Sequence, residues 1–281
     1  MTAKPLHSDN RTALTLDEMI DMGNNIIGFV EYILKELRTI VRLKKDILFM
    51  FSLSRAVVQL SSISVLYGKN HFSDCMILYR TQVERLLTLY YLIDTETIQD
   101  FDDWSFIQNF EARNKARSDK DQNEHLNPKF WKESSDRVDR YQRLKKRDVK
   151  WSRPNSEKLE EIAKSHDVHE FFKYGYRDAS GFVHPLASDG EEEYALVTEI
   201  KPRNHLELDR RPIFSNSLVV FILIVELALN EMNFSWNKYV FSFIDRCKDS
   251  IRNGNPDYLE SKKIIDGFII NNLPIFKKLS E

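Results

Sequence analysis

The chain has 281 residues, of which 42% are hydrophobic and 30% charged, with only 8 Gly and 8 Pro. This composition is typical of a helical globular protein and argues against a disordered or fibrous chain. The net charge of −2 excludes a globally basic surface, so any contact with a polyanion has to be local. The two cysteines, Cys75 and Cys247, lie in apolar segments, which favours buried thiols in a reducing cytoplasm over disulfides.

Neither secretion nor a membrane anchor is indicated. Residues 1–10 contain His7 and Asp9 but no apolar core, so they do not have the pattern of a signal peptide. The longest uninterrupted apolar run, residues 218–225, is shorter than the roughly 18 residues expected of a membrane-spanning helix. We therefore expect a cytoplasmic protein with no membrane partner.

The first part of the chain predicts three long helices. Residues 16–43 carry apolar residues at steps of three or four, the spacing of one helix face. These residues are Met19, Met22, Ile26, Phe29, Ile33, Leu37 and Ile40. Apolar segments at 47–67 and 72–93 follow, separated by Gly68, a residue type that commonly ends helices. Together the three segments predict an up-and-down bundle.

The middle of the chain is more polar. Helix is expected over 102–120 and again over 131–147, with Pro128 near the start of the second helix. After a break at 152–156, a short helix should precede a helical segment at 168–184. The acidic stretch 188–193 and the residues 194–202 predict a loop with at most a short extended piece.

The last part predicts three more helices. Residues 213–232 are apolar nearly all round, which indicates a core helix or a subunit interface. Helices at 239–252 and 258–271 should follow, with a turn at 253–256 between them.

The predicted fold is all-α, a helical bundle with additional flanking helices and very little strand. We divide it into an N-terminal helical segment (1–45), a helical core (46–235) that includes a basic middle segment (128–153), and a C-terminal helical segment (236–281) packed on the core.

Familiar enzyme signatures are absent: there is no Gly-rich phosphate loop, zinc-protease helix, nucleophile elbow or paired-cysteine motif. No cofactor is therefore indicated. His166 and His169 have a helical three-residue spacing that could hold a metal. Solvated or helix-capping histidines are more common, so we predict no metal site.

The segment 176–184 carries the most informative pattern. In an α-helix seven residues advance about 700°, so Arg177 and His184 return to one face about 10 Å apart. Ser180 and Gly181 between them are small and would let a phosphodiester or another helix approach. An adjacent face would bury Phe172, Tyr176, Ala179 and Val183.

Pro185 disfavours the α conformation at the residue before it, so His184 should end its helix. The helix dipole favours a protonated imidazole at that end, which suits a general acid.

Arg177, followed directly by Asp178 and after a few residues by His184, resembles the motif of the HEPN superfamily of helical domains. The earlier apolar helix with Arg80 and Glu84 adds to the likeness to bacterial HEPN-like proteins. This resemblance implies a metal-independent endoribonuclease, commonly a homodimer in which the motif helices of two subunits form a composite site. Members of the superfamily recur in antiphage defence and toxin systems.

The residues suit that chemistry. His184 could exchange a proton with the ribose 2′-hydroxyl or the departing 5′-oxygen, while Arg177 neutralises charge on the phosphate. Asp178 could orient Arg177 or the histidine of the partner subunit.

Arg80 and Glu84 are four residues apart on a helix and can form an ion pair. This pair has two interpretations. It is structural, or Arg80 is a second phosphate contact that Glu84 holds in place. Together with Ser180, we treat the pair as supporting residues of the site.

Residues 137–153 contain eight basic and two acidic residues. Tyr141 and Trp151 add flat surfaces on which RNA bases could stack. The candidate RNA contacts are Arg140, Arg143, Lys146, Arg147 and Lys150. A solvated helix face is the alternative interpretation.

Two functions remain open from the sequence. The first is an HEPN-like ribonuclease that binds RNA, acts as a homodimer, and can be restrained by a regulatory protein or antitoxin. The second is a non-catalytic helical module that binds a ligand or partner in a defence or regulatory system.

Overall fold

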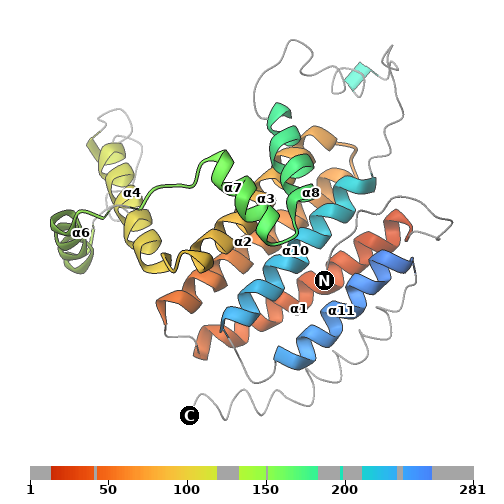
Figure 1. Cartoon of the computed structure of the whole chain (residues 1–281), viewed down its shortest axis with the longest axis horizontal. Coiled ribbons are helices and arrows are strands. Elements are labelled where there is room, and N and C mark those ends of the chain that lie inside the picture. The colour runs from red at the N-terminus through yellow and green to blue at the C-terminus, as the bar shows by residue number, and fades with distance from the viewer. Residues whose placement is uncertain are drawn as a thin grey trace. The chain divides into compact units, whose positions relative to one another are not determined.

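The computed structural model describes residues 14–40, 43–118, 133–149, 151–182, 197–198, 211–232 and 237–254 (Figure 1). Every regular element in these ranges is a helix, and none of these residues belongs to a strand. The predicted all-α fold class is confirmed.

The contacts of the chain separate it into two compact units. Unit 1 comprises residues 1–88 and 157–281, and unit 2 comprises residues 89–156. The boundaries expected from the sequence, at 45 and 235, both lie inside unit 1. The basic middle segment lies in unit 2.

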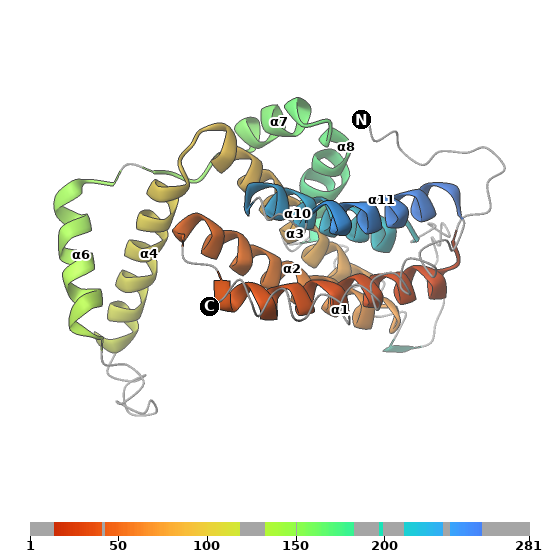
Figure 2. The ribbon, with the colours of Figure 1, turned by 90° about the horizontal axis from the view of Figure 1, so that it is seen from below.

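Unit 1 is built around α2 (Lys44–Tyr67), which packs against α1 (Leu16–Ile40) and α10 (Arg211–Met232). The last described helix, α11 (Asn237–Asn253), packs against α10 (Figures 1 and 2). Aromatic pairs join these helices. Phe29 of α1 meets Phe243 of α11 at 5.4 Å between ring centroids, and Tyr67 of α2 meets Phe214 of α10 at 5.7 Å.

The first helix forms as its periodicity predicts. α1 buries Met19, Met22, Ile26, Phe29, Ile33 and Leu37. Thr15 and Glu18 form a reciprocal cap at its start. The Thr15 amide donates to Glu18 Oε2 at 2.7 Å, and the Glu18 amide donates to Thr15 Oγ1 at 3.3 Å.

The most apolar helix, α10, is used inside unit 1. Its residues Phe214, Leu218, Phe221 and Ile222 are fully buried. Of the two interpretations that the sequence left open for this helix, the structure therefore shows the core helix. By length and apolar composition alone, α2 and α10 are also the described helices that could cross a membrane.

The turn after α2 differs from expectation in one detail. The helix does end at Tyr67, but Gly68 keeps a right-handed conformation with φ of −63°. Asn70, with φ of 62°, is the left-handed residue instead. Asparagine is one of the few residues with a side chain that adopts this conformation readily, so Gly68 is not what reverses the chain.

The helix that follows, α3 (Phe72–Asp94), runs from unit 1 into unit 2. In unit 1, α7 (Ser156–Ser165) is followed by the short α8 (His169–Phe171). A π-helix, η2 (Phe172–Arg177), and a 3-10 helix, η3 (Asp178–Phe182), continue directly from α8.

Unit 2 contains a helical hairpin formed by α4 (Ile98–Ser118) and α6 (Ser135–Arg147) (Figure 2). Its apolar core is small and comprises Phe106, Ile107, Phe110 and Leu144. Pro128, the expected start of the second helix, lies outside the described residues. A hairpin with so few apolar residues needs other interactions between its helices.

Candidate functional site

The segment that carries the sequence motif is not the α-helix that was predicted over 168–184. Only residues 169–171 are α-helical, and η2 and η3 follow. A 3-10 helix turns about 120° per residue, whereas the α-helix used in the prediction turns about 100°. Residues 178–182 therefore do not follow the α-helical spacing from which Arg177 and His184 were expected to share one face. His184 itself lies outside the described residues.

Gly175 lies at a close contact between this segment and α3. A Cβ atom at this position would lie 2.6 Å from Val83 Cγ2 and 2.7 Å from Tyr79 Cζ. The backbone of η2 therefore lies directly against α3, closer than any residue with a side chain would permit. π turns within helices are frequent at functional sites. The sequence analysis missed Gly175, although a glycine inside an aromatic helical segment is a signal of close backbone approach.

Stacked rings anchor the same segment. Phe172 is fully buried and stacks on Tyr176 at 5.4 Å, and Ala179 is also fully buried. Three of the four residues that were expected to share a packed face are thus partly or wholly covered, and Val183 lies outside the described residues. Apolar and aromatic packing, rather than ion pairs, therefore holds the motif segment in place.

Arg80 of α3 reaches over to this segment. Its Nε donates a hydrogen bond to Ser180 Oγ at 3.0 Å, and its guanidinium lies 4.9 Å from the ring centroid of Tyr176. Ser180 donates its own proton to the carbonyl of Tyr176 at 2.5 Å, so its oxygen accepts from Arg80. The predicted supporting residues Arg80 and Ser180 therefore come together across 100 residues of sequence.

The terminal nitrogens of Arg80 form an ion pair with Glu84 but no hydrogen bond among the described residues. Glu84 Oε2 lies 4.0 Å from Arg80 Nη1, which is beyond hydrogen-bond distance. Within the described residues, no acceptor takes a hydrogen bond from the two terminal amino groups of Arg80. The Arg80 side chain is only 19% exposed. The geometry is that of an oriented, partly buried guanidinium whose outer edge can bind an anion.

Arg177 is held more loosely. Its Nε lies 3.5 Å from Asp178 Oδ1, and its side chain is 58% exposed. An exposed pair of this kind contributes little to stability. Arg177 and Asp178 are therefore neighbours, as predicted, and the pairing leaves Arg177 free to reorient toward a ligand.

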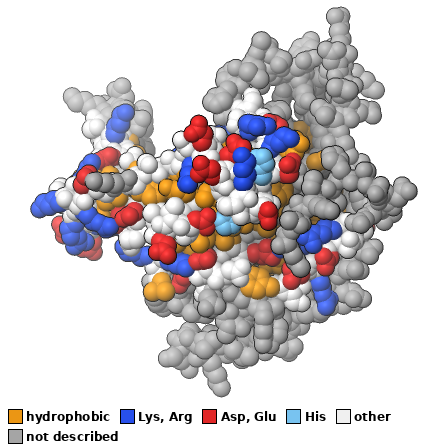
Figure 3. Space-filling view, viewed as in Figure 1, with side chains coloured by type: hydrophobic (Ala, Val, Ile, Leu, Met, Phe, Trp, Pro, Cys, Tyr) orange, Lys and Arg blue, Asp and Glu red, His pale blue; other side chains and the backbone are white. Residues whose placement is uncertain are grey.

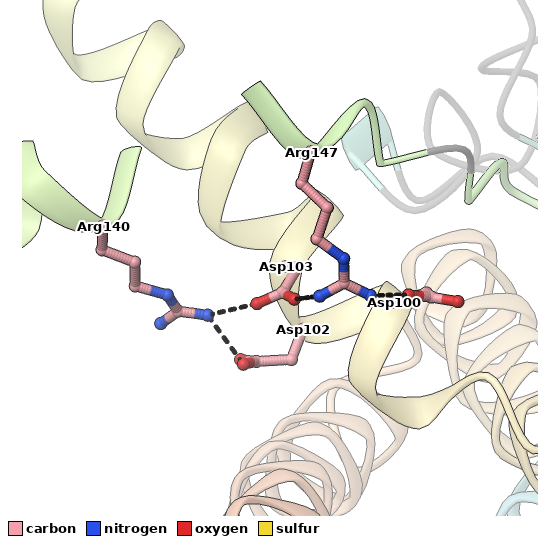
Figure 4. Close-up of polar contacts among 5 residues, drawn as sticks. All are labelled: Asp100, Asp102, Asp103, Arg140 and Arg147. Carbon is pink, nitrogen blue, oxygen red and sulfur yellow. Dashed lines mark hydrogen bonds and ion pairs between the residues drawn. The ribbon is translucent and has the colours of Figure 1, made fainter. Parts of the chain in front are cut away.

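The basic segment of unit 2 has a different environment. Arg140 donates to Asp102 at 2.7 Å and to Asp103 at 3.0 Å (Figure 4). Arg147 donates to Asp103 and to Asp100, both at 2.9 Å. The Asp103 side chain is only 4% exposed and bridges the two arginines. Two predicted RNA contacts, Arg140 and Arg147, thus join α6 to α4.

Further ion pairs strengthen the hairpin. Glu133 accepts from Arg137 at 2.6 Å and from Arg117 at 3.1 Å. Burial raises the pKa of Glu133, but the hydrogen bonds from these two arginines outweigh it and the net pKa is lowered. Lys145 pairs with Glu111 at 2.6 Å. The local excess of positive charge in the sequence is therefore largely neutralised by acidic residues from outside it.

The two aromatic residues of the basic segment are also occupied. Trp151 packs against Phe101 and Trp104, with ring centroids 4.8 and 4.7 Å apart. Tyr141 stacks on Phe110 at 4.3 Å, so neither offers the free flat surface that was expected. Of the remaining predicted RNA contacts, Arg143 and Lys146 are exposed without an ion pair among the described residues, and Lys150 lies outside those residues.

The described residues contain no cluster of His, Cys, Asp and Glu side chains that could hold a metal. His169 instead places its Nε2 3.3 Å from Glu160 Oε1 and stacks on Phe172. On the face drawn in Figure 3, acidic and basic side chains are interspersed. Any anion site on that face is consequently local.

A sequence model of a family of unknown function, DUF5677, matches residues 46–195. The match covers more than half of the chain and includes α2, the hairpin of unit 2 and the whole motif segment. No curated protein and no solved structure matches the chain.

Proposed function

Because the chain belongs to DUF5677, a family whose function is not established, we propose from its own residues that it is a HEPN-like, metal-independent endoribonuclease. In this proposal Arg177 and His184 are the catalytic residues, with Asp178 beside them. Antiphage defence or a toxin system is the proposed setting, in the cytoplasm and with RNA as substrate.

The observation that carries the proposal is the state of Arg80. Its partly buried guanidinium is fixed at Nε, and its ion pair with Glu84 at 4.0 Å leaves the terminal nitrogens without a hydrogen bond among the described residues, so a phosphate oxygen can still accept one there. It contacts Tyr176 and Ser180, and Arg177 and Asp178 lie between these two residues in the chain. A phosphodiester bound to Arg80 would thus lie beside the segment that contains Arg177 and Asp178.

The proposed reaction balances without an added nucleophile. The ribose 2′-oxygen forms a bond to phosphorus as it loses its proton to a base, and the bond from phosphorus to the 5′-oxygen breaks. The departing 5′-oxygen takes a proton from an acid, for which His184 is proposed. Arg80 and Arg177 would stabilise the charge that develops on the phosphoryl oxygens. The products are a 2′,3′-cyclic phosphate and a 5′-hydroxyl.

The proposed enzyme is a homodimer. HEPN-like sites are commonly composite, so the exposed position of Arg177 fits a site that a second subunit completes. Light scattering at micromolar concentration checks this part of the proposal. If the protein cleaves RNA as a monomer, the composite site is wrong but the nuclease activity stands.

The alternative function is a non-catalytic module that binds a ligand or partner. The contact between Arg177 and Asp178 is the observation that favours this alternative. A guanidinium that pairs with a neighbouring carboxylate has a structural role that requires no phosphate. The alternative and the nuclease differ in what His184 does. Only in the nuclease does removal of its imidazole abolish a reaction.

The test is cleavage of total cellular RNA by the purified protein in EDTA, followed by analysis of the product ends. Arg177→Ala and His184→Ala should each lower the rate by about 100-fold or more. Arg252→Ala, which removes a partly exposed arginine of α11, is the matched control and should cleave like the wild type. If Arg177→Ala and His184→Ala cleave RNA at the wild-type rate, or if the wild type does not cleave, the binding module is favoured.

A further inference from the structure

One face of α2 is apolar and uncovered. Ile47, Phe51, Val58 and Val65 are between 36% and 68% exposed. Their spacings of four, seven and seven residues place them in a line along one side of the helix. From the first to the last this line is about 27 Å long at 1.5 Å per residue. An apolar surface of this length on a helix is typical of an interaction site.

The serine hydroxyls within this apolar face donate their hydrogen bonds to the backbone of α2 itself, so they do not require water as a partner. Ser54 donates to the carbonyl of Met50 at 2.8 Å, and Ser61 donates to the carbonyl of Val57 at 2.9 Å. Ser62 likewise donates to the carbonyl of Val58 at 2.9 Å. Because these hydroxyl protons are already used, another helix can cover the face without leaving an unsatisfied donor.

Two arginines flank the face on the side of α3. Arg85 of α3 points its Nε at Gln59 Oε1 of α2, 3.4 Å away, and Gln59 in turn donates to Thr81 at 2.6 Å. Burial, followed by the positive charge of Arg55, lowers the pKa of Arg85. Among the described residues neither Arg55 nor Arg85 has a carboxylate partner. A partly buried cation beside a like charge is unfavourable unless an anion joins it.

The charges of Arg55 and Arg85 distinguish between two possible occupants of this face, a second copy of the chain and a helix of another protein. In a symmetric dimer that pairs α2 with α2, the two-fold axis would match Ile47 of one copy with Val65 of the other. The centre of that pairing is Ala56, so Arg55 of both copies would meet there, with each Arg85 close by. Like charges brought together at an interface oppose association. Self-association through α2 is therefore disfavoured.

We propose that this face binds an amphipathic helix of a partner protein that carries carboxylates along one edge. The apolar side of that helix would cover the line from Ile47 to Val65, and its carboxylates would pair with Arg55 and Arg85. The inference does not depend on the proposed nuclease activity, because it rests on α2 and on a different arginine pair.

The test uses the full chain and a designed fluorescent helical peptide of the length of α2, apolar on one side and with glutamates along the adjoining edge. A second peptide with lysines in place of the glutamates is the charge control. Anisotropy should show the acidic peptide binding at least about tenfold more tightly than the basic one. Phe51→Ser and Arg55→Glu should each weaken the acidic peptide about tenfold, and Arg55→Glu should bind the basic peptide more tightly than the wild type does.

Both substituted residues are exposed, and thermal melts should show that the variants remain folded. Equal binding of the two peptides, or no binding of either, would overturn the proposal. Vesicles of phosphatidylcholine with phosphatidylserine should not bind. Vesicle binding that Phe51→Ser abolishes would assign the face to a membrane surface, and loss of a wild-type dimer in Phe51→Ser would assign it to a second copy.

Discussion

The motif segment of unit 1 and the hairpin of unit 2 use the same residue type for opposite purposes. In the hairpin, Arg140 and Arg147 hold α6 to α4 through Asp100, Asp102 and Asp103. In unit 1, Arg80 is oriented by a serine hydroxyl and a tyrosine ring, and its terminal amino groups form a long ion pair with Glu84 but donate no hydrogen bond to the described residues.

Apolar packing explains the difference. The motif segment is anchored by buried Phe172 and Ala179 and by the close approach of Gly175 to α3, so its arginines are not needed for cohesion. The hairpin has a core of only four buried residues, and ion pairs supply part of what that core lacks. An arginine is therefore a better candidate for ligand binding where apolar contacts already hold the backbone.

The largest expected difference comes from removing Arg80 and Arg140 one at a time. Arg80→Ala should lower RNA cleavage about 100-fold, because a positioned donor to the phosphate is lost. Arg140→Ala should leave cleavage near the wild-type rate and lower the free energy of unfolding by about 1–2 kcal/mol, because the partly exposed charged hydrogen bonds to Asp102 and Asp103 are lost. Cleavage rates and urea unfolding of both variants check this. The contrast breaks if Arg140→Ala loses more activity than Arg80→Ala.

The second prediction concerns packing at the motif segment. Gly175→Ala should lower the free energy of unfolding by about 1–3 kcal/mol, because the added methyl group would overlap the side chains of Val83 and Tyr79. Gly28→Ala in α1 is the matched control, since a Cβ there meets nothing within 4 Å. That control should be neutral or stabilising by up to about 1 kcal/mol. Denaturant unfolding compares them, and equal stabilities would contradict the close approach of η2 to α3.

The smallest expected effect is local to the hairpin. Asp103→Asn weakens the bridge between Arg140 and Arg147, and because both arginines are partly exposed the loss should be about 1–2 kcal/mol. Hydrogen exchange of amides in α4 and α6 should accelerate, while that of α10 should not. Asp139→Asn, an exposed aspartate of α6, is the control. Unchanged exchange in α4 and α6 would mean that the bridge does not stabilise the hairpin.

Local patterns in the chain were sufficient to predict most of the long helices among the described residues. The apolar periodicity of α1 and the all-round apolarity of α10 correspond to helices within two or three residues of the expected bounds, because periodicity reports directly which side of a helix is buried. The pairing of neighbours such as Arg177 with Asp178, and the approach of Arg80 to Glu84, also follow from short spacing. Predictions of this kind need only the regular geometry of one helix.

The same reasoning failed where a distant segment determined the result. The predicted α-helix over 168–184 ignored Tyr79 and Val83, against which Gly175 packs nearly 100 residues away. The positive charge counted over 137–153 did not include Asp100, Asp102 and Asp103, which pair with Arg140 and Arg147 from α4; RNA contact by this segment stays a prediction.

The sequence by itself therefore determined that the chain is all-α, where most of its helices run, and which residues could carry chemistry. Only the tertiary structure decided which arginines are available. The physical reason is that availability depends on which carboxylates, rings and backbones from distant segments meet a side chain, and on how much apolar packing already holds them together.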